Sequence, residues 1–160
     1  MKKYTYEVEL DSNPANPRTE WDNVTTMICF HKRYDLGDKH NIKFQDYDSW
    51  EELEEAIKSE YNVLAIAPLY LYDHSGITIS TKPFSCPWDS GRIGFIIIDE
   101  KQYKVMMGEL DNATEVQLND IIINEVETYD KYIQGEVYGY RTYEVETCSL
   151  GHEHKVMIDS

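Results

Sequence analysis

The stretch that decides the fold runs from Tyr70 to Ile98 and reads YLYDHSGITISTKPFSCPWDSGRIGFIII. Both of its ends are apolar runs of strand-forming residues, and the run at 92–98 is the most strand-like in the chain. Loops that a rigid scaffold holds in place commonly carry function, so the segment between the two runs is a candidate functional loop. Its chemically capable side chains are Asp73, His74, Ser75, Cys86, Trp88 and Asp89.

Hydrophobic periodicity on either side of this stretch predicts a mixture of strands and helices. The expected strands are residues 3–10, 24–30, 63–71, 77–81, 92–98 and 136–146. The expected helices are residues 49–60, 100–107 and 114–134. Capping pairs open all three helices: Ser49 with Glu52, Asp99 with Gln102 and Thr114 with Gln117. The helix at 100–107 is expected to end at Gly108. This order predicts a single α+β domain over residues 1–160, with an antiparallel or mixed sheet and two to three helices packed on it.

The chain is strongly acidic, with 30 carboxylates, 15 basic residues and a formal net charge of −15. Two segments hold most of the excess: residues 46–60 carry seven carboxylates against one lysine, and residues 109–130 carry seven against none. Both segments are expected helices, and their acids fall largely on the faces that point away from the core. The residues assigned to this acidic surface are Asp46, Asp48, Glu51, Glu52, Glu55, Glu115, Asp120, Glu125 and Glu127.

Two interpretations of the acidic surface stay open. It is either a solubilising face or a partner-binding surface that imitates the phosphates of nucleic acid and occupies a basic groove. Direct binding of DNA or RNA is not expected, because the sequence has no basic stripe. Reversing the charge of Glu51, Glu55, Glu125 and Glu127 is expected to leave the fold intact, since all four lie off the apolar stripes.

The candidate loop also admits an enzymatic or ligand-binding alternative. Cys86 or Ser90 could form a nucleophilic triad with His74 and an aspartate, either Asp73 or Asp89. No known nucleophile motif surrounds these residues, however. Metal-ligand spacing is also missing, because Cys29-x-His31 and His152-x-His154 lack the separations of structural zinc sites. We therefore assign no catalytic residue, no metal and no cofactor.

The structural interpretation of the loop makes a definite prediction about its contacts. Trp88 and Phe84 are expected to pack against the sheet. Asp73 and Asp89 are expected to accept hydrogen bonds from backbone amides, as aspartates in turns do.

The sequence favours a cytoplasmic protein. No apolar run approaches the roughly 20 residues of a membrane span, and MKKYTYEVEL lacks the apolar region of a secretory signal. The three cysteines, Cys29, Cys86 and Cys148, are expected to be free thiols.

Two segments resemble a family of small, mostly uncharacterised proteins of tailed phages and integrated mobile elements. They are NPRTEWDNVTTMICFHKRYDLGDKHN (16–41) and LYLYDHSGITISTKPFSCPWDSGRIGFIII (69–98). VYGYRTYEVE is similar to the closing strand of that family, and Cys148-Ser149-Leu150-Gly151 resembles a diverged form of its Cys- and Gly-rich tail. The resemblance implies an origin in a phage or mobile element and carries over no catalytic residue.

This origin and the acidic helices together suggest a counter-defence protein. It would bind and inhibit a nucleic-acid-processing defence complex of an infected or lysogenic bacterial host, of the anti-CRISPR or anti-restriction type. The alternatives are a small enzyme or ligand-binding protein that uses the 73–90 loop, and a regulatory accessory protein of a phage.

Overall fold

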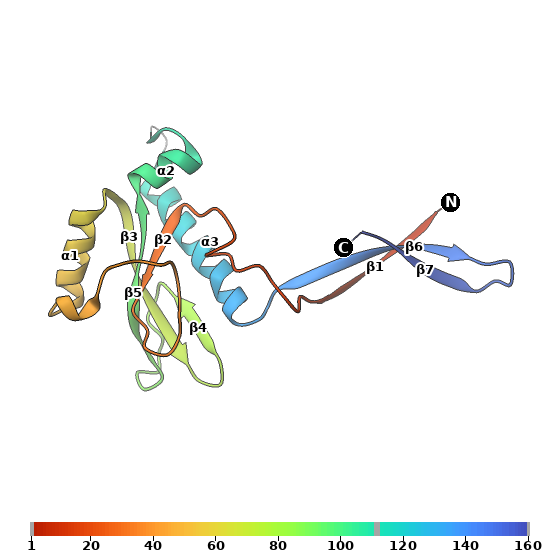
Figure 1. Ribbon diagram of the computed structural model, residues 1–160, viewed down its shortest axis with the longest axis horizontal. Coiled ribbons are helices and arrows are strands. Elements are labelled where there is room, and N and C mark those ends of the chain that lie inside the picture. Colours follow the sequence, from red (N-terminus) through yellow and green to blue (C-terminus); the bar gives the residue numbers. More distant parts are fainter. Residues whose placement is uncertain (1, 111–112, 160) are drawn as a thin grey trace. The chain divides into compact units, whose positions relative to one another are not determined.

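The computed structural model describes residues 2–110 and 113–159, which form three α-helices and two antiparallel sheets (Figure 1). The predicted α+β class, with helices packed on an antiparallel sheet, is confirmed. The chain contains two compact units, one made of Ala15–Gln134 and the other of the segments before and after it. That residues 1–160 form a single domain stays a prediction. No helix in the described part of the chain is both long and apolar enough to cross a membrane.

The larger unit is built on a four-stranded antiparallel sheet. Its order is β2 (Thr25–Cys29), β5 (Ser90–Asp99), β3 (Val63–Asp73) and β4 (Ile77–Ser80). β5 is an inner strand, and Ile93–Ile98 is buried without interruption. An antiparallel strand with one wet face would alternate apolar and polar residues, so this unbroken run requires cover on both faces of the sheet.

Helix α1 (Trp50–Glu60) covers one face, after a short 3-10 turn, η1 (Phe44–Asp46). Leu53 and Ile57 of α1 form a cluster with Ile28, Phe95 and Ile97 of the sheet, and all five are fully buried. The helix begins at Ser49, whose hydroxyl accepts the N–H of Glu52 at 3.1 Å, as the sequence predicts.

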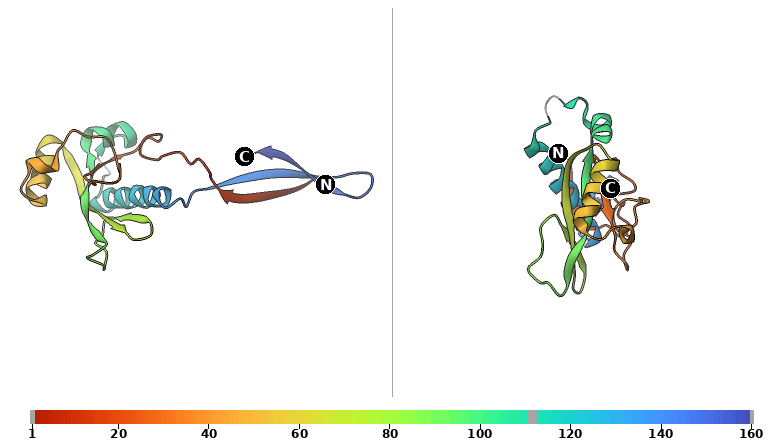
Figure 2. Two further views of the ribbon diagram at one scale, coloured as in Figure 1. Left: turned by 60° about the horizontal axis from the view of Figure 1, so that its bottom comes forward. Right: turned by 90° about the vertical axis from the view of Figure 1, so that its left-hand side faces the viewer.

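Helix α3 (Glu115–Ile133) covers the opposite face (Figure 1, Figure 2). Its buried residues Ile122, Val126 and Tyr129 pack with Ile96 and Ile98 of β5. The predicted capping box of Thr114 and Gln117 is present. The sheet therefore lies between two helices that both carry acidic residues.

Gly94 allows β2 and β5 to approach closely. A Cβ at this position would overlap the carbonyl oxygen of Ile28 on the paired strand. The register between β3 and β5 also shifts here, between Leu69 and Tyr70. Because of this irregularity, Ile93 lies on the α3 face although Phe95, two residues later, lies on the α1 face.

A helix cap at the end of β5 turns the chain into α2 (Glu100–Met107). The carboxylate of Asp99 accepts the N–H groups of Lys101 and Gln102, at 3.0 and 3.2 Å. The helix ends at Gly108, whose φ of 92° favours glycine. Both the cap and the end agree with the sequence prediction.

The smaller unit is a three-stranded antiparallel sheet. Its order is β1 (Lys3–Leu10), β6 (Tyr138–Thr147) and β7 (Glu153–Asp159). β1 and β6 come from the two ends of the chain and pair over their length, from Lys3 with Val145 to Leu10 with Tyr138.

A buried arginine joins three separate segments of the larger unit. The side chain of Arg18 is 1 % exposed and bonds Asp38 through both Nε and Nη2. Its Nη1 lies 2.8 Å from Oε2 of Glu125, and its Nη2 donates to the carbonyl of Thr25 at 2.8 Å. The two carboxylates in turn accept backbone N–H groups, Asp38 from Met27 at 2.7 Å and Glu125 from Val24 at 2.8 Å.

These bonds satisfy a charge that could not otherwise remain buried. They link the 15–24 loop and the 31–40 loop to β2 and to the middle of α3. Because Asp38 and Glu125 are both shielded, losing the guanidinium would leave two carboxylates without their counter-charge.

Replacing Arg18 by methionine is expected to lower the free energy of unfolding by about 3–5 kcal/mol, the range for a broken buried ion pair. Urea denaturation followed by circular dichroism measures the loss. Arg33→Met is the matched control, because Arg33 is also ion-paired, to Asp73, but its side chain is 69 % exposed. A loss for Arg18→Met no larger than that of the control would contradict the role given to the buried cluster.

Candidate functional site

The candidate loop, residues 73–90, leaves the end of β3, includes β4 and returns at the start of β5. The N–H of Asp73 donates to the carbonyl of Asp89 at 2.7 Å, and the hydroxyl of Ser90 donates to the carbonyl of Cys86. Phe84 packs on Tyr72 of β3, with ring centroids 5.7 Å apart. The loop therefore leaves from a firm base at the ends of β3 and β5.

Trp88 does not pack against the sheet, so that prediction is wrong. Its side chain is 92 % exposed, whereas Phe84 is half-buried as expected. The physical reason is the turn at 86–90: its hydrogen bonds fix the two ends, and Phe84 takes the apolar contact with Tyr72. Trp88 stands in the middle of this turn and is left in solvent.

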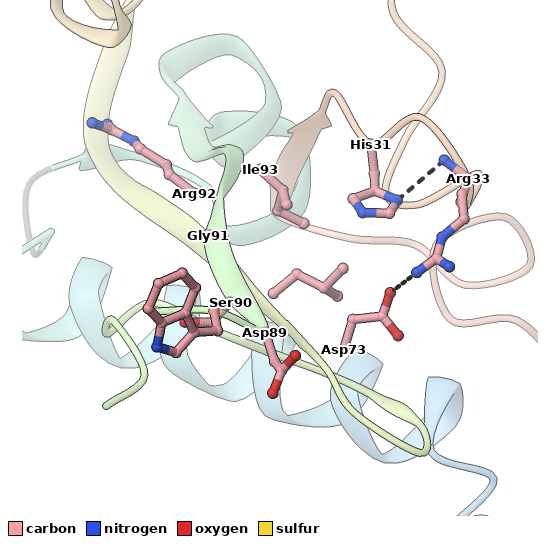
Figure 3. Close-up of a pocket in the computed structure, with 10 residues that line it drawn as sticks. His31, Arg33, Asp73, Asp89, Ser90, Gly91, Arg92 and Ile93 are labelled. Atoms are coloured by element: carbon pink, nitrogen blue, oxygen red, sulfur yellow. Dashed lines mark hydrogen bonds and ion pairs between the residues drawn. The ribbon is translucent and has the colours of Figure 1, made fainter. Parts of the chain in front are cut away.

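Asp73 accepts hydrogen bonds from side chains, which corrects the prediction that it would cap backbone amides. It pairs with the guanidinium of Arg33 (Figure 3). It also accepts the hydroxyl of Tyr34 at 3.3 Å. The Arg33 hydrogen bond lowers the pKa of Asp73 below its usual value. His31 stacks on Tyr34 at 4.9 Å, and its Nδ1 accepts the N–H groups of Arg33 and Tyr34. This region is thus a small ion-paired network between the 31–34 turn and the end of β3.

Asp89 also contacts side chains where backbone amides were expected. Its Oδ2 lies 3.3 Å from Nδ1 of His74 and 3.6 Å from Sγ of Cys86. A nucleophilic cysteine requires a base to take its proton, and the partner found for this thiol is a carboxylate. The hydroxyl of Ser90 donates to a carbonyl. The geometry gives neither side chain the imidazole partner that an activated nucleophile needs.

Ser75 is a turn residue. Its φ is 58° and that of the following Gly76 is 156°, which are conformations of the tight turn that joins β3 to β4. A Ser-Gly pair is typical of such a turn, and the Ser75 side chain is exposed.

A shallow pocket of about 410 Å³ lies beside the loop. Arg33, Asp73, Trp88, Asp89 and Arg92 are among the residues that line it. Arg92 and Ile93 extend to opposite sides of β5 (Figure 3). In the described ranges, 2–110 and 113–159, no three His, Cys, Asp or Glu side chains come together as a metal site would require. The pocket suits a polar group, because its lining holds the Arg33–Asp73 ion pair together with Asp89 and Arg92.

Arg92 connects this pocket to α1. Its guanidinium lies over the rings of Phe95, at 4.2 Å, and Trp50, at 5.2 Å, and it reaches Glu54 at 3.6 Å. Its buried Nε has no hydrogen-bond partner in the described structure. The loop and the acidic helix α1 are therefore neighbours through one residue that the sequence did not single out.

The acidic residues of η1 and α1 form an exposed cluster, as predicted. These are Asp46, Asp48, Glu51, Glu52 and Glu55. Only half of the predicted capping box forms, because the Glu52 side chain accepts the N–H of Asp48, the residue before the N-cap Ser49, at 2.7 Å. Lys58 offsets part of the charge, since it pairs with Glu54 at 2.9 Å and with Glu55 at 3.1 Å.

The predicted acidic surface is wrong at one residue of α3. Glu115, Asp120 and Glu127 are exposed, but Glu125 turns inward to Arg18 and is 18 % exposed. Glu125 is therefore a structural residue, and the expectation that reversing its charge would leave the fold intact is wrong. Asp130 is structural too, because it accepts the N–H of Ile79 at 2.8 Å and the hydroxyl of Thr78 at 2.7 Å.

The two exposed acidic surfaces lie on opposite sides of the molecule's larger unit. α1 and α3 cover opposite faces of one sheet, so a flat partner surface can contact the acids of only one helix at a time (Figure 1).

Comparison with known proteins adds no further constraint. No family model matches the chain, and no curated protein and no solved structure is significantly similar to it. The phage-family resemblance therefore stays a prediction.

The three free thiols differ in environment, which gives a direct test of the site. Burial raises the pKa of Cys29 to about 12, and the nearby Asp38 adds to the shift. In contrast, the backbone N–H groups of Leu150 and His152 lower the pKa of Cys148. With iodoacetamide at pH 8, we expect Cys148 to be alkylated first and Cys29 only on unfolding, since the thiolate is the reactive form.

Peptide mass spectrometry over a time course measures this order. The Cys148→Ser variant is the control, because it should abolish the fast phase alone. Labelling of Cys86 ahead of Cys148 would contradict the geometry and would restore Cys86 as a candidate nucleophile.

Proposed function

We propose that the protein binds and inhibits a nucleic-acid-processing defence complex of a bacterial host, of the anti-CRISPR or anti-restriction type, in the cytoplasm of an infected or lysogenic cell. The observation that carries the proposal is the exposed carboxylate cluster of η1 and α1. It holds Asp46, Asp48, Glu51, Glu52 and Glu55, all exposed. Of these five, Glu55 pairs with Lys58.

The spacing of these carboxylates supports imitation of a nucleic-acid backbone. Glu51 and Glu55 are four residues apart on a helix, which places them about 6 Å apart along its axis. That is on the order of two phosphate steps along one DNA strand. A groove lined with Lys and Arg for a phosphate backbone would therefore meet carboxylates at a comparable spacing.

The exposed Trp88 gives the surface an apolar anchor beside the charges. Trp, Tyr and Arg are enriched among the residues that dominate protein–protein binding energies. Trp88 lines the same pocket as Arg92, and Arg92 reaches Glu54 of α1. We therefore place the main contact on the α1 side, with the loop as its second element.

The exposed acids of α3 have a different role in this proposal. Because α3 covers the opposite face of the sheet, Glu115, Asp120 and Glu127 do not share a flat contact with α1. They act as a solubilising face, which is the alternative interpretation of the acidity and here applies to one helix only.

Two triple variants separate the two faces. The α1 variant carries Asp46→Lys, Glu51→Lys and Glu55→Lys, and the α3 control carries Glu115→Lys, Asp120→Lys and Glu127→Lys. Each changes the formal net charge from −15 to −9, and each places one lysine in a first helical turn, so both bear the same cost of about 0.3–1 kcal/mol against the helix dipole. Glu125 and Glu52 are left unchanged because both make structural hydrogen bonds.

The measurement is a quantitative pull-down from a host lysate at about 50 mM and about 200 mM salt, analysed by mass spectrometry. Nucleic-acid-processing proteins should be retained by the wild type and by the α3 control. The α1 variant should retain at least tenfold less of these proteins than the wild type does. The wild type at the higher salt should show the same decrease relative to the lower salt. Equal retention by the folded α1 variant would refute the proposal and leave solubility as the only explanation of the acidity.

A second candidate function is the binding of a small polar ligand in the pocket beside the loop. The observation that favours it is Trp88, which stands exposed at the edge of a pocket whose polar groups include Arg33 and Asp73. The quenching of tryptophan fluorescence by a panel of nucleotides and sugars tests it, with Trp88→Phe as the variant.

Trp88→Ala distinguishes the two candidates. The substitution should leave the unfolding midpoint unchanged, because an exposed side chain contributes little to stability. If the loop serves a protein partner, the variant should lower the recovery of that partner from lysate at least fivefold. Full recovery, together with loss of a saturable ligand response, would favour the pocket function over the protein contact.

A further inference from the structure

The three-stranded sheet of the smaller unit has two unlike faces. Residues paired across antiparallel strands share a face, so the register assigns each side chain. Tyr4 and Tyr6 lie opposite Glu144 and Thr142, while Lys3 and Thr5 lie opposite Val145 and Tyr143. The even positions of β1 therefore belong to one face and the odd positions to the other.

The face that holds the odd-numbered residues of β1 (the odd face) carries ion pairs between side chains of its own strands. Lys3 reaches Glu153 at 2.7 Å and Arg141 reaches Glu9 at 2.6 Å. Lys155 pairs with Glu7 at 2.6 Å. These bonds satisfy the charges of that face and suit it to contact with water.

The even face is apolar and uncovered. Its large side chains are between 44 % and 73 % exposed. They are Tyr4, Tyr6, Val8, Leu10, Tyr138, Tyr140 and Val156. Contiguous apolar patches of this kind on a protein surface mark interaction sites.

The area of this apolar face matches one side of a standard protein interface. A tyrosine side chain contributes roughly 150–250 Å² when it is fully buried. Four tyrosines that are more than half exposed thus supply on the order of 500 Å². The three aliphatic side chains bring the face towards the about 800 Å² that each partner buries in a standard complex.

The two ends of this face differ in polarity. Lys2 and Glu144 pair there at 2.8 Å, and Glu146 lies opposite His154 in the register of β6 and β7. The other end of the face holds Leu10 and Tyr138. A second copy of the chain offers a face of the same area and the same division: a two-fold axis parallel to the strands superposes apolar end on apolar end, and each copy keeps its own Lys2–Glu144 pair at the charged end.

We infer that the apolar face of the β1–β6–β7 sheet binds the same face of a second copy of this chain, and that the protein is a dimer. The two sheets form an aligned sandwich about 10 Å thick, with the tyrosines between them. This inference goes beyond the proposed inhibitory function and uses none of the residues assigned to it.

Two variants of adjacent residues on β6 test the inference. Tyr140→Lys places a charge in the apolar face. Gly139→Lys places the same side chain on the opposite face, where an added Cβ meets nothing within 4 Å. Analytical ultracentrifugation of the full chain from about 1 to 100 µM gives the mass, and thermal unfolding over the same range gives a second reading that needs no variant.

The wild type and Gly139→Lys should approach twice the chain mass of 18.8 kDa at the upper concentrations. Their unfolding midpoints should also rise with concentration. Tyr140→Lys should remain a monomer. A wild type that stays monomeric at about 100 µM with a concentration-independent midpoint would overturn the inference, and so would a monomer whose apolar face instead binds lipid vesicles or another protein.

Discussion

The larger unit depends on the guanidinium of Arg18, which is buried with Asp38 and Glu125. A charge in this position is tolerated only because its hydrogen bonds are satisfied, and those bonds come from three parts of the chain. The same carboxylates accept the N–H groups of Val24, just before β2, and of Met27, in the middle of β2. One ionic cluster thus sets how the edge strand and the α3 helix meet, beside a core whose other contacts are apolar.

This cluster changes which acidic residues are available to a binding partner. A count of carboxylates treats residues 46–60 and 109–130 as equivalent, because each holds seven. The structure assigns Glu125 and Asp130 to internal bonds and leaves three described acids of α3 in solvent. The η1–α1 cluster keeps its five exposed carboxylates and adjoins the exposed Trp88 through Arg92. A contact surface with both charge and an aromatic anchor is therefore centred on α1.

Local patterns were enough to predict most of the fold. Ser49, Thr114 and Asp99 cap the three helices as their sequence signatures indicate, and the apolar run at 92–98 forms the inner strand β5. The errors concern contacts between distant residues. Arg18 and Glu125 are 107 positions apart, and neither has a local pattern that marks it as buried. Trp88 was misplaced for a different reason: its apolar character favours the core, but the hydrogen bonds that close the 86–90 turn hold it outside.

The most direct test of the central role of Arg18 is a double-mutant cycle with Glu125. Urea unfolding gives the free energies of the wild type, Arg18→Met, Glu125→Gln and the double variant. Arg18→Met leaves Glu125 without its counter-charge, and Glu125→Gln removes one of the two carboxylates that pair with Arg18. We therefore expect a coupling energy of about 2 kcal/mol or more. Losses that simply add, with no coupling, would contradict the view that this ion pair ties α3 to β2.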